Sequence, residues 1–67
     1  MRYVVAQKRE DRVNGRLTDQ EIIAELSFPH TVLSLGDGYV LIEADSHPPP
    51  NFRLWIEPEI TYRLAND

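Results

Sequence analysis

The sequence predicts an α+β domain in which a mostly antiparallel sheet of four or five strands carries one or two short helices on one face. Three observations predict this class: a short β-forming run comes first, a capped amphipathic helix follows it, and several extended segments then succeed one another. The expected order is β-α-α-β-β-β. A chain of 67 residues has space for one core, so residues 1–67 are expected to form a single small domain.

The first two elements are a strand and a polar segment. Residues 2–6, RYVVA, are rich in β-branched and aromatic side chains, which favours a strand. Residues 7–13 are polar and lead to Asn14-Gly15, a pair that closes either a short helix or a two-residue hairpin. The flanking segments do not alternate apolar and polar residues as hairpin strands do, so we prefer the helix.

The clearest local signal is a helix that begins at Asp19. Thr18 and Glu21 have the spacing of a capping box, in which each side chain accepts a hydrogen bond from the backbone N–H of the other residue. Proline cannot continue helical hydrogen bonding and disfavours helical geometry at the residue before it, so Pro29 is expected to end the helix. The expected buried stripe consists of Ile22, Ile23 and Leu26.

An extended pattern follows the helix. Residues 31–35 (TVLSL) and 39–44 (YVLIEA), joined by Gly-Asp-Gly, predict a β-hairpin, and the second strand is apolar on both faces near its start, as a central strand is. Alternation in the first strand separates Thr31, Leu33 and Leu35 from Val32 and Ser34.

Two more strands are predicted at residues 52–57 and 60–64. Alternation within residues 52–57 places Phe52, Leu54 and Ile56 on one face and Arg53, Trp55 and Glu57 on the other. The preceding segment, residues 45–51 (DSHPPPN), is expected to join two adjacent strands. Its three prolines stiffen the loop and block strand propagation, whereas a polyproline ligand for an aromatic groove normally lies in a longer tract with PxxP spacing.

Composition excludes several classes of protein. The chain has no cysteine, which removes disulfides, thiolate catalysis and cysteine-containing zinc sites and is compatible with a reducing cytoplasm. No apolar stretch approaches the roughly 20 residues of a membrane span, and the first eleven residues turn charged too early for a signal peptide. We therefore expect a soluble cytoplasmic protein without a membrane partner.

The net charge of −4 is unevenly distributed. Residues 1–17 carry five basic and two acidic side chains, a net charge of +3, whereas the other fifty residues carry two basic and nine acidic ones, a net charge of −7. An acidic body does not favour broad binding to nucleic acid, because neutralisation of phosphates supplies most non-specific affinity. It favours a protein partner with basic surface.

The sequence offers little for catalysis or metal binding. Asp45 and His47 are close enough in sequence for acid–base work, but His30 is the one other histidine, and two histidines without cysteine have no recognised ligand spacing. Residues 35–38, LGDG, lack the further glycines and the lysine of a phosphate-binding loop. We therefore expect no metal and no cofactor, and the catalytic residues are unknown.

Two groups of side chains are candidates for binding. Arg9, Arg12 and Arg16 recur at three- and four-residue spacing, so a helix would display them on one face as a contact for RNA phosphates or as a solvated, salt-bridged surface. Trp55, next to Arg53, is predicted on the strand face away from the core. There it covers a second apolar face or contributes to an interface, where Trp and Arg often supply binding energy.

The run REDRVNGRLTDQEIIAELSFPHTVLSLGDGYVLI resembles small bacterial domains related to RelE-type and BrnT-type toxins. These domains have an arginine-rich helix that ends at glycine, then a capped helix, a proline and a strand hairpin. The resemblance covers roughly residues 6 to 64 and implies RNA cleavage in active members, with the basic helix as the RNA contact. The matching residues are Arg9, Arg12, Gly15, Thr18, Glu21, Ile22, Leu26 and Pro29.

Two functional hypotheses follow. The sequence departs from the toxin pattern in having Ala6 and Gln7 where a histidine is usual, and in its acidic body. The first hypothesis is therefore a non-enzymatic interaction module that binds a protein partner, or a second copy of itself, through Trp55 and Arg53. The alternative is a toxin-like ribonuclease that binds RNA through Arg9, Arg12 and Arg16.

Overall fold

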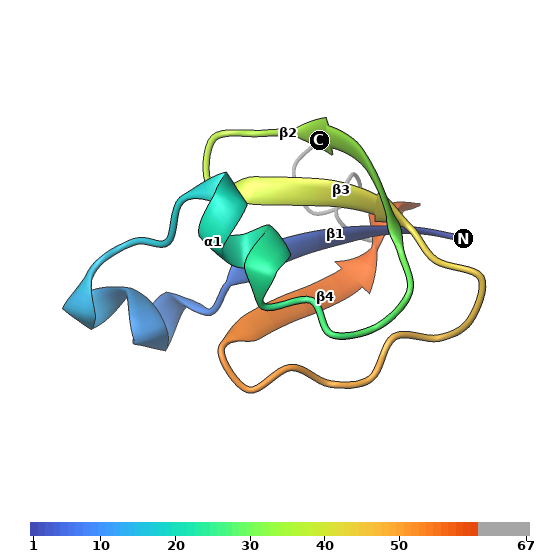
Figure 1. Cartoon of the computed structure of the whole chain (residues 1–67). Helices are drawn as coiled ribbons and strands as arrows, with labels where there is room; N and C mark the ends of the chain where they lie inside the picture. Colours follow the sequence, from blue (N-terminus) through green and yellow to red (C-terminus); the bar gives the residue numbers. More distant parts are fainter. Residues whose placement is uncertain (61–67) are drawn as a thin grey trace.

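The protein has an α+β fold with one open antiparallel sheet, as the sequence predicts (Figure 1). The computed structural model describes residues 1–60. Within this range no helix is long and apolar enough to cross a membrane. The strands are β1 (Arg2–Gln7), β2 (Thr31–Leu35), β3 (Tyr39–Glu43) and β4 (Leu54–Pro58), and the helices are the 3₁₀ helix η1 (Arg9–Asn14) and the α-helix α1 (Asp19–Ala24).

The strand order is β2-β3-β1-β4, so the first strand of the chain lies inside the sheet. Val5 pairs with Val40 of β3 on one side and with Ile56 of β4 on the other, both antiparallel. Strands β3 and β4 therefore run in the same direction with β1 between them. The expectation that residues 45–51 join adjacent strands is wrong, because residues 44–53 are a crossover that returns along the outer side of β4 (Figure 1).

This connection explains the triple proline. A crossover between strands of the same direction has to run back along the sheet, and three prolines keep that segment extended without needing hydrogen-bond partners for their nitrogens. Pro48 is buried, whereas Pro49 and Pro50 are exposed.

The core lies between α1 and one face of the sheet. Thr18 caps α1, because its hydroxyl accepts the Glu21 N–H at 3.2 Å while the Glu21 carboxylate accepts the Thr18 N–H at 3.2 Å. The helix ends at Ala24, with Glu25 as its C-cap, and not at Pro29 as expected. A six-residue helix is enough to cover the centre of so small a sheet. The fully buried side chains that fill this core are Val5, Ile22, Val40, Ile42 and Leu54.

The outer strands depart from simple alternation. Strand β4 begins at Leu54, so Phe52, predicted to face the core, lies in the preceding loop and is 94% exposed. Strand β2 has a bulge between Val32 and Ser34, which places Val32 opposite Ile42 and Leu35 opposite Val40 on the same face. The predicted separation of Leu35 from Val32 is therefore wrong. Beyond Ile60, the predicted strand 60–64 lies outside the described residues.

The polar segment after β1 is a 3₁₀ helix, which excludes the hairpin alternative. Gly15 ends it with a φ of 117°, a backbone conformation that favours glycine. The buried side chain of Gln7 fixes the segment to the sheet. Its amide nitrogen donates to the carbonyls of Asp11 (3.1 Å) and Gly15 (3.2 Å), and its amide oxygen accepts the Leu17 N–H at 2.8 Å.

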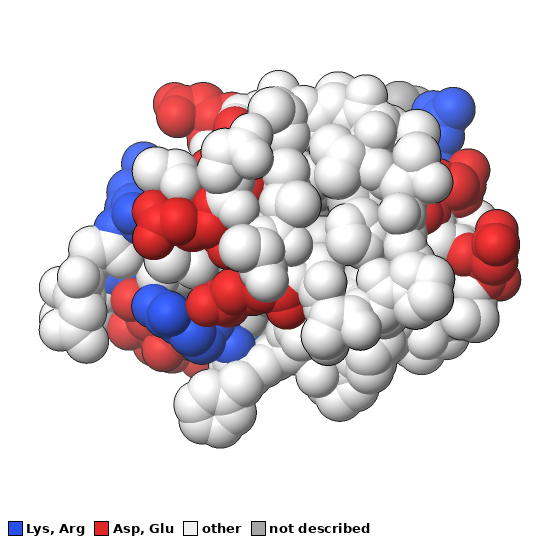
Figure 2. Space-filling model, viewed as in Figure 1, with Lys and Arg blue, Asp and Glu red and all other residues white. Residues whose placement is uncertain are grey.

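Charged side chains are unevenly placed on the face that carries α1. Figure 2 shows acidic and basic side chains gathered toward the two ends of this view, with a broad uncharged area between them. Part of this pattern follows from the sequence, because residues 26–36 contain no Lys, Arg, Asp or Glu.

Candidate functional site

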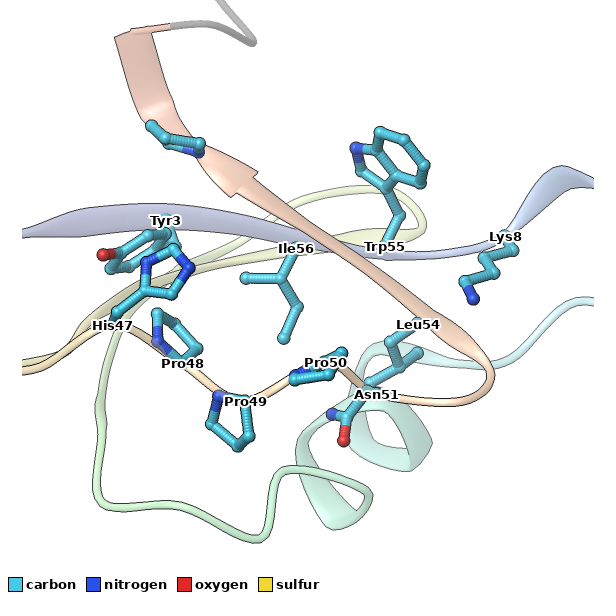
Figure 3. Close-up of a pocket in the computed structure, with 11 residues that line it drawn as sticks. Tyr3, Lys8, His47, Pro48, Pro49, Pro50, Asn51, Leu54, Trp55 and Ile56 are labelled. Carbon is cyan, nitrogen blue, oxygen red and sulfur yellow. The ribbon is translucent and has the colours of Figure 1, made fainter.

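Trp55 lies on the sheet face away from α1 and is 56% exposed. Its neighbours in β4, Leu54 and Ile56, point to the core side, and Figure 3 shows Trp55 and Ile56 on opposite sides of the strand. The small Ala6 is its cross-strand partner on β1. The indole N–H donates to a Glu57 carboxylate oxygen at 3.0 Å, which orients a ring that would otherwise turn freely in solvent.

On one side of Trp55, β4 and the crossover enclose an apolar hollow of about 450 Å³, which we call the proline groove. The prolines form one wall, and Tyr3 and His47 lie at one end, with their rings in edge-to-face contact at 6.3 Å (Figure 3). The side-chain nitrogen of Asn51, also in the wall, is buried and has no hydrogen-bond partner among the described residues. The groove therefore combines apolar surface with one unused donor.

On another side, Trp55 lines a second hollow of about 410 Å³ with the start of η1, which we call the basic hollow. Its lining includes three cationic side chains, Lys8, Arg9 and Arg12, and one anionic side chain, Glu10. A 3₁₀ helix has three residues per turn, so Arg9 and Arg12 lie on one side of η1. Arg12 is also held in place, because its guanidinium donates to the Gln7 carbonyl at 2.9 Å.

The two hollows share Lys8 and Trp55. We call these two hollows, with the residues that they share, the Trp55 site; the indole ring itself lies on the side of β4 opposite the prolines (Figure 3). The structure thus brings together Trp55, Arg9 and Arg12, which the sequence suggested for two unrelated roles.

Arg16 does not join this site. It lies beyond Gly15, which ends η1, and lines a separate hollow beside the β2–β3 turn with Asp19 and Asp37. Its guanidinium lies against Gly38, where an added Cβ atom would be 2.6 Å from the Arg16 Nη2 atom. The three arginines therefore do not form the single patch that a continuous helix would display.

Arg53 is also separated from Trp55. It precedes β4, and its guanidinium pairs with the Glu25 carboxylate at 3.1 Å, on the α1 side of the sheet. The predicted placement of Arg53 and Trp55 on one face is wrong, because β4 begins at Leu54 and Arg53 lies in the loop before it.

The remaining titratable candidates have structural contacts. His47 packs against the Tyr3 ring, and His30 contacts the Phe28 ring while its Nδ1 lies 2.7 Å from the Phe28 carbonyl oxygen. Among the described residues, no three His, Asp or Glu side chains form a group that could hold a metal ion.

Sequence reasoning missed Lys8 and the groove wall formed by residues 48–51. The signal was present in the triple proline, but its meaning depended on the strand order. If residues 45–51 are interpreted as a crossover between strands of the same direction, their prolines predict an extended wall beside an edge strand.

Comparison with known proteins gives no relative for this chain: it matches no protein-family model, no curated protein and no solved structure. The resemblance to RelE-type and BrnT-type toxins therefore stays a prediction.

Proposed function

We propose that the protein is a non-enzymatic interaction module that binds an extended segment of a protein partner at the Trp55 site. The observation that carries the proposal is a 56% exposed tryptophan shared by an apolar groove and a basic hollow. Trp and Arg are the side chains most often responsible for binding energy at protein interfaces. A partner that covers this exposed ring removes a large apolar surface from water.

The chemistry of the two hollows indicates which residue types the bound segment of the partner should contain. The proline groove accepts an apolar side chain, and the unused Asn51 donor favours a backbone or side-chain oxygen next to it. The basic hollow, with three cations and one anion, favours a carboxylate. The expected ligand is a short extended peptide that carries an apolar residue followed or preceded by Asp or Glu. Local charge thus favours an acidic segment, although the acidic body as a whole favours a basic partner.

Contacts within the protein hold the side chains of the site. The Glu57 carboxylate holds the indole of Trp55, the Gln7 carbonyl holds Arg12, and three prolines limit the motion of the groove wall. Binding to a rigid site avoids about 0.5–1.5 kcal/mol of ordering cost for each side chain that would otherwise be immobilised. This arrangement supports recognition of a flexible partner by a fixed surface.

The test is a selection of random peptides displayed on phage against the protein, followed by affinity measurements on the enriched peptides. We expect enrichment of sequences that pair an apolar residue with Asp or Glu, and a loss of roughly 10- to 100-fold in affinity for Trp55→Ala. Phe52→Ala is the matched control, because Phe52 is a more exposed aromatic residue, 94%, that lines neither hollow. Peptides that bind Trp55→Ala as tightly as the native protein would overturn the proposal.

The ribonuclease alternative has one observation in its favour, since an aromatic ring beside two arginines is also a surface on which single-stranded RNA can stack and be neutralised. It predicts cleavage of single-stranded RNA that Arg9→Ala and Arg12→Ala abolish while the far-ultraviolet circular dichroism spectrum is retained. RNA binding or cleavage at this site, without selection of any peptide, would replace the interaction module by this alternative.

A further inference from the structure

The edge of the sheet formed by β2 differs from the Trp55 site because, within residues 1–60, no other strand lies beside it. In the described part of the chain, β2 pairs with β3 alone, so the backbone N–H and C=O groups on its outer side have no strand partner. All five of its residues are exposed. Such an edge is a template for another strand, and natural proteins usually block it with charges, proline or a covering loop.

The side chains of β2 make this edge apolar as well as open. Val32, Leu33 and Leu35 are 37%, 42% and 51% exposed. No charged residue occurs between residues 26 and 36, although 27% of the chain is charged. The uncharged area in Figure 2 includes this edge. Among the described residues, the bulge between Val32 and Ser34 is the one protective device of β2.

We propose that two copies of the chain associate through their β2 edges in an antiparallel pair, which joins the two four-stranded sheets into one continuous sheet. The open edge requires an extended backbone as its occupant, and its apolar side chains require apolar partners. A second copy supplies both. Each copy carries a net charge of −4, so copies repel one another wherever charged surfaces meet, and the uncharged β2 edge is where that repulsion is smallest.

The local sequence suits a two-fold pairing. If Leu33 lies near the two-fold axis that relates the two copies, the antiparallel β2 strands place their apolar residues beside one another. The strand sequence TVLSL brings no charge into this contact. The bulge between Val32 and Ser34 disturbs the regular spacing of backbone groups along β2, so we expect the two copies to pair through only a few residues on either side of it. We therefore expect a weak, concentration-dependent dimer with a Kd in the micromolar range, as is typical of small interfaces.

The other edge of the sheet explains why association stops at two copies. The crossover runs along the outer side of β4 and its prolines cannot donate backbone hydrogen bonds, so β4 offers no equivalent template (Figure 1). A contact between two β2 edges is thus closed and does not propagate into a filament. The two Trp55 sites lie at the far edges of the joined sheet and stay accessible, so this inference does not rest on the proposed function.

The experiment measures molar mass by sedimentation equilibrium from about 1 µM to 1 mM, a range that brackets the micromolar affinities of weak complexes. We expect the mass to rise from that of a 7.8 kDa chain to twice that value. Leu33→Lys should weaken the dimer at least tenfold, because it introduces a charge at the centre of the pair. Phe52→Lys is the control: it makes the same change in net charge at an exposed residue in the loop before β4, and it should leave the dimer unchanged.

A second measurement locates the contact. Amide proton exchange of residues 31–35 should slow as the concentration rises, while exchange in β4 should not. A monomer throughout the range would overturn the proposal. A dimer that Leu33→Lys leaves intact, or whose protected amides lie at β4, would also overturn it, since self-association would then use the Trp55 surface.

Discussion

The two edges of the sheet are built from strands of equal length, yet they have opposite characters. Strand β4 directs Leu54 into the core, where it is 2% exposed, and carries Trp55, the proline groove and the basic hollow on its other sides. Strand β2 has no buried residue and no charge. The difference follows from connectivity. A tight turn joins β2 to β3, and no other described strand pairs with the outer side of β2, whereas the crossover and η1 both lie beside β4. The position of a strand in the chain therefore decides which edge acquires a structured site.

The largest expected effect comes from truncating the same side chain at each edge. Leu54→Ala should lower the free energy of unfolding by about 2–5 kcal/mol, because it leaves a cavity in the core. Leu35→Ala, at a residue 51% exposed on β2, should cost less than about 1 kcal/mol. Urea unfolding at low protein concentration, where the monomer dominates, measures both. Equal losses would show that β2 is anchored as firmly as β4 and would remove the contrast between the edges.

A smaller effect is expected from the amide that fixes η1 beside β4. Gln7→Met keeps the length of the side chain but leaves the Asp11 carbonyl, the Gly15 carbonyl and the Leu17 N–H without their partner. A loss of about 2–4 kcal/mol is expected, since unsatisfied buried polar groups cost about 1–3 kcal/mol each and some will regain water.

The control for this change is the exposed Gln20 of α1, for which substitution by Met should alter stability by less than about 0.5 kcal/mol. Thermal unfolding followed by circular dichroism measures both variants. If Gln7→Met were as mild as Gln20→Met, η1 would be held by other contacts, and the basic hollow would not depend on Gln7.

The smallest effect concerns the ion pair that ties the loop before β4 to α1. The side chains of Arg53 and Glu25 are 48% and 31% exposed, so water screens their attraction. A double-mutant cycle with Arg53→Met and Glu25→Gln should give a coupling free energy of about 0.2–1 kcal/mol that disappears in about 1 M salt. A larger, salt-insensitive coupling would show that α1 stabilises the β4 edge directly.

The sequence predicted the elements well and their arrangement poorly. The capping box at Thr18 and the alternation in residues 39–44 are local signals, and both elements are present. Strand order depends on pairing between residues distant in the chain, and nothing in RYVVA indicates that it pairs on both sides. Phe52 was misplaced for a related reason, since alternation alone does not show where a strand begins.

The sequence predicted the residues of the candidate site separately, for two different roles. Trp55 was recognised by its place on the polar side of a strand, and Arg9 and Arg12 by their spacing. Their association depends on the pairing of Ala6 with Trp55, which brings the segment after β1 next to β4. The sequence analysis grouped Arg16 with Arg9 and Arg12, and Arg53 with Trp55, because these residues are near one another in sequence. The structure separates Arg16 and Arg53 from the site.

The central position of β1 also has a consequence for how the chain folds as it is made. Both strands that pair with β1 follow it in the sequence, β3 from Tyr39 and β4 from Leu54. During synthesis, residues 2–7 are made before either neighbour, so Tyr3, Val4 and Val5 have no strand partner until β3 and β4 follow. The four-stranded sheet can be completed only once β4 has been made, so its closure depends on contacts between residues far apart in the chain.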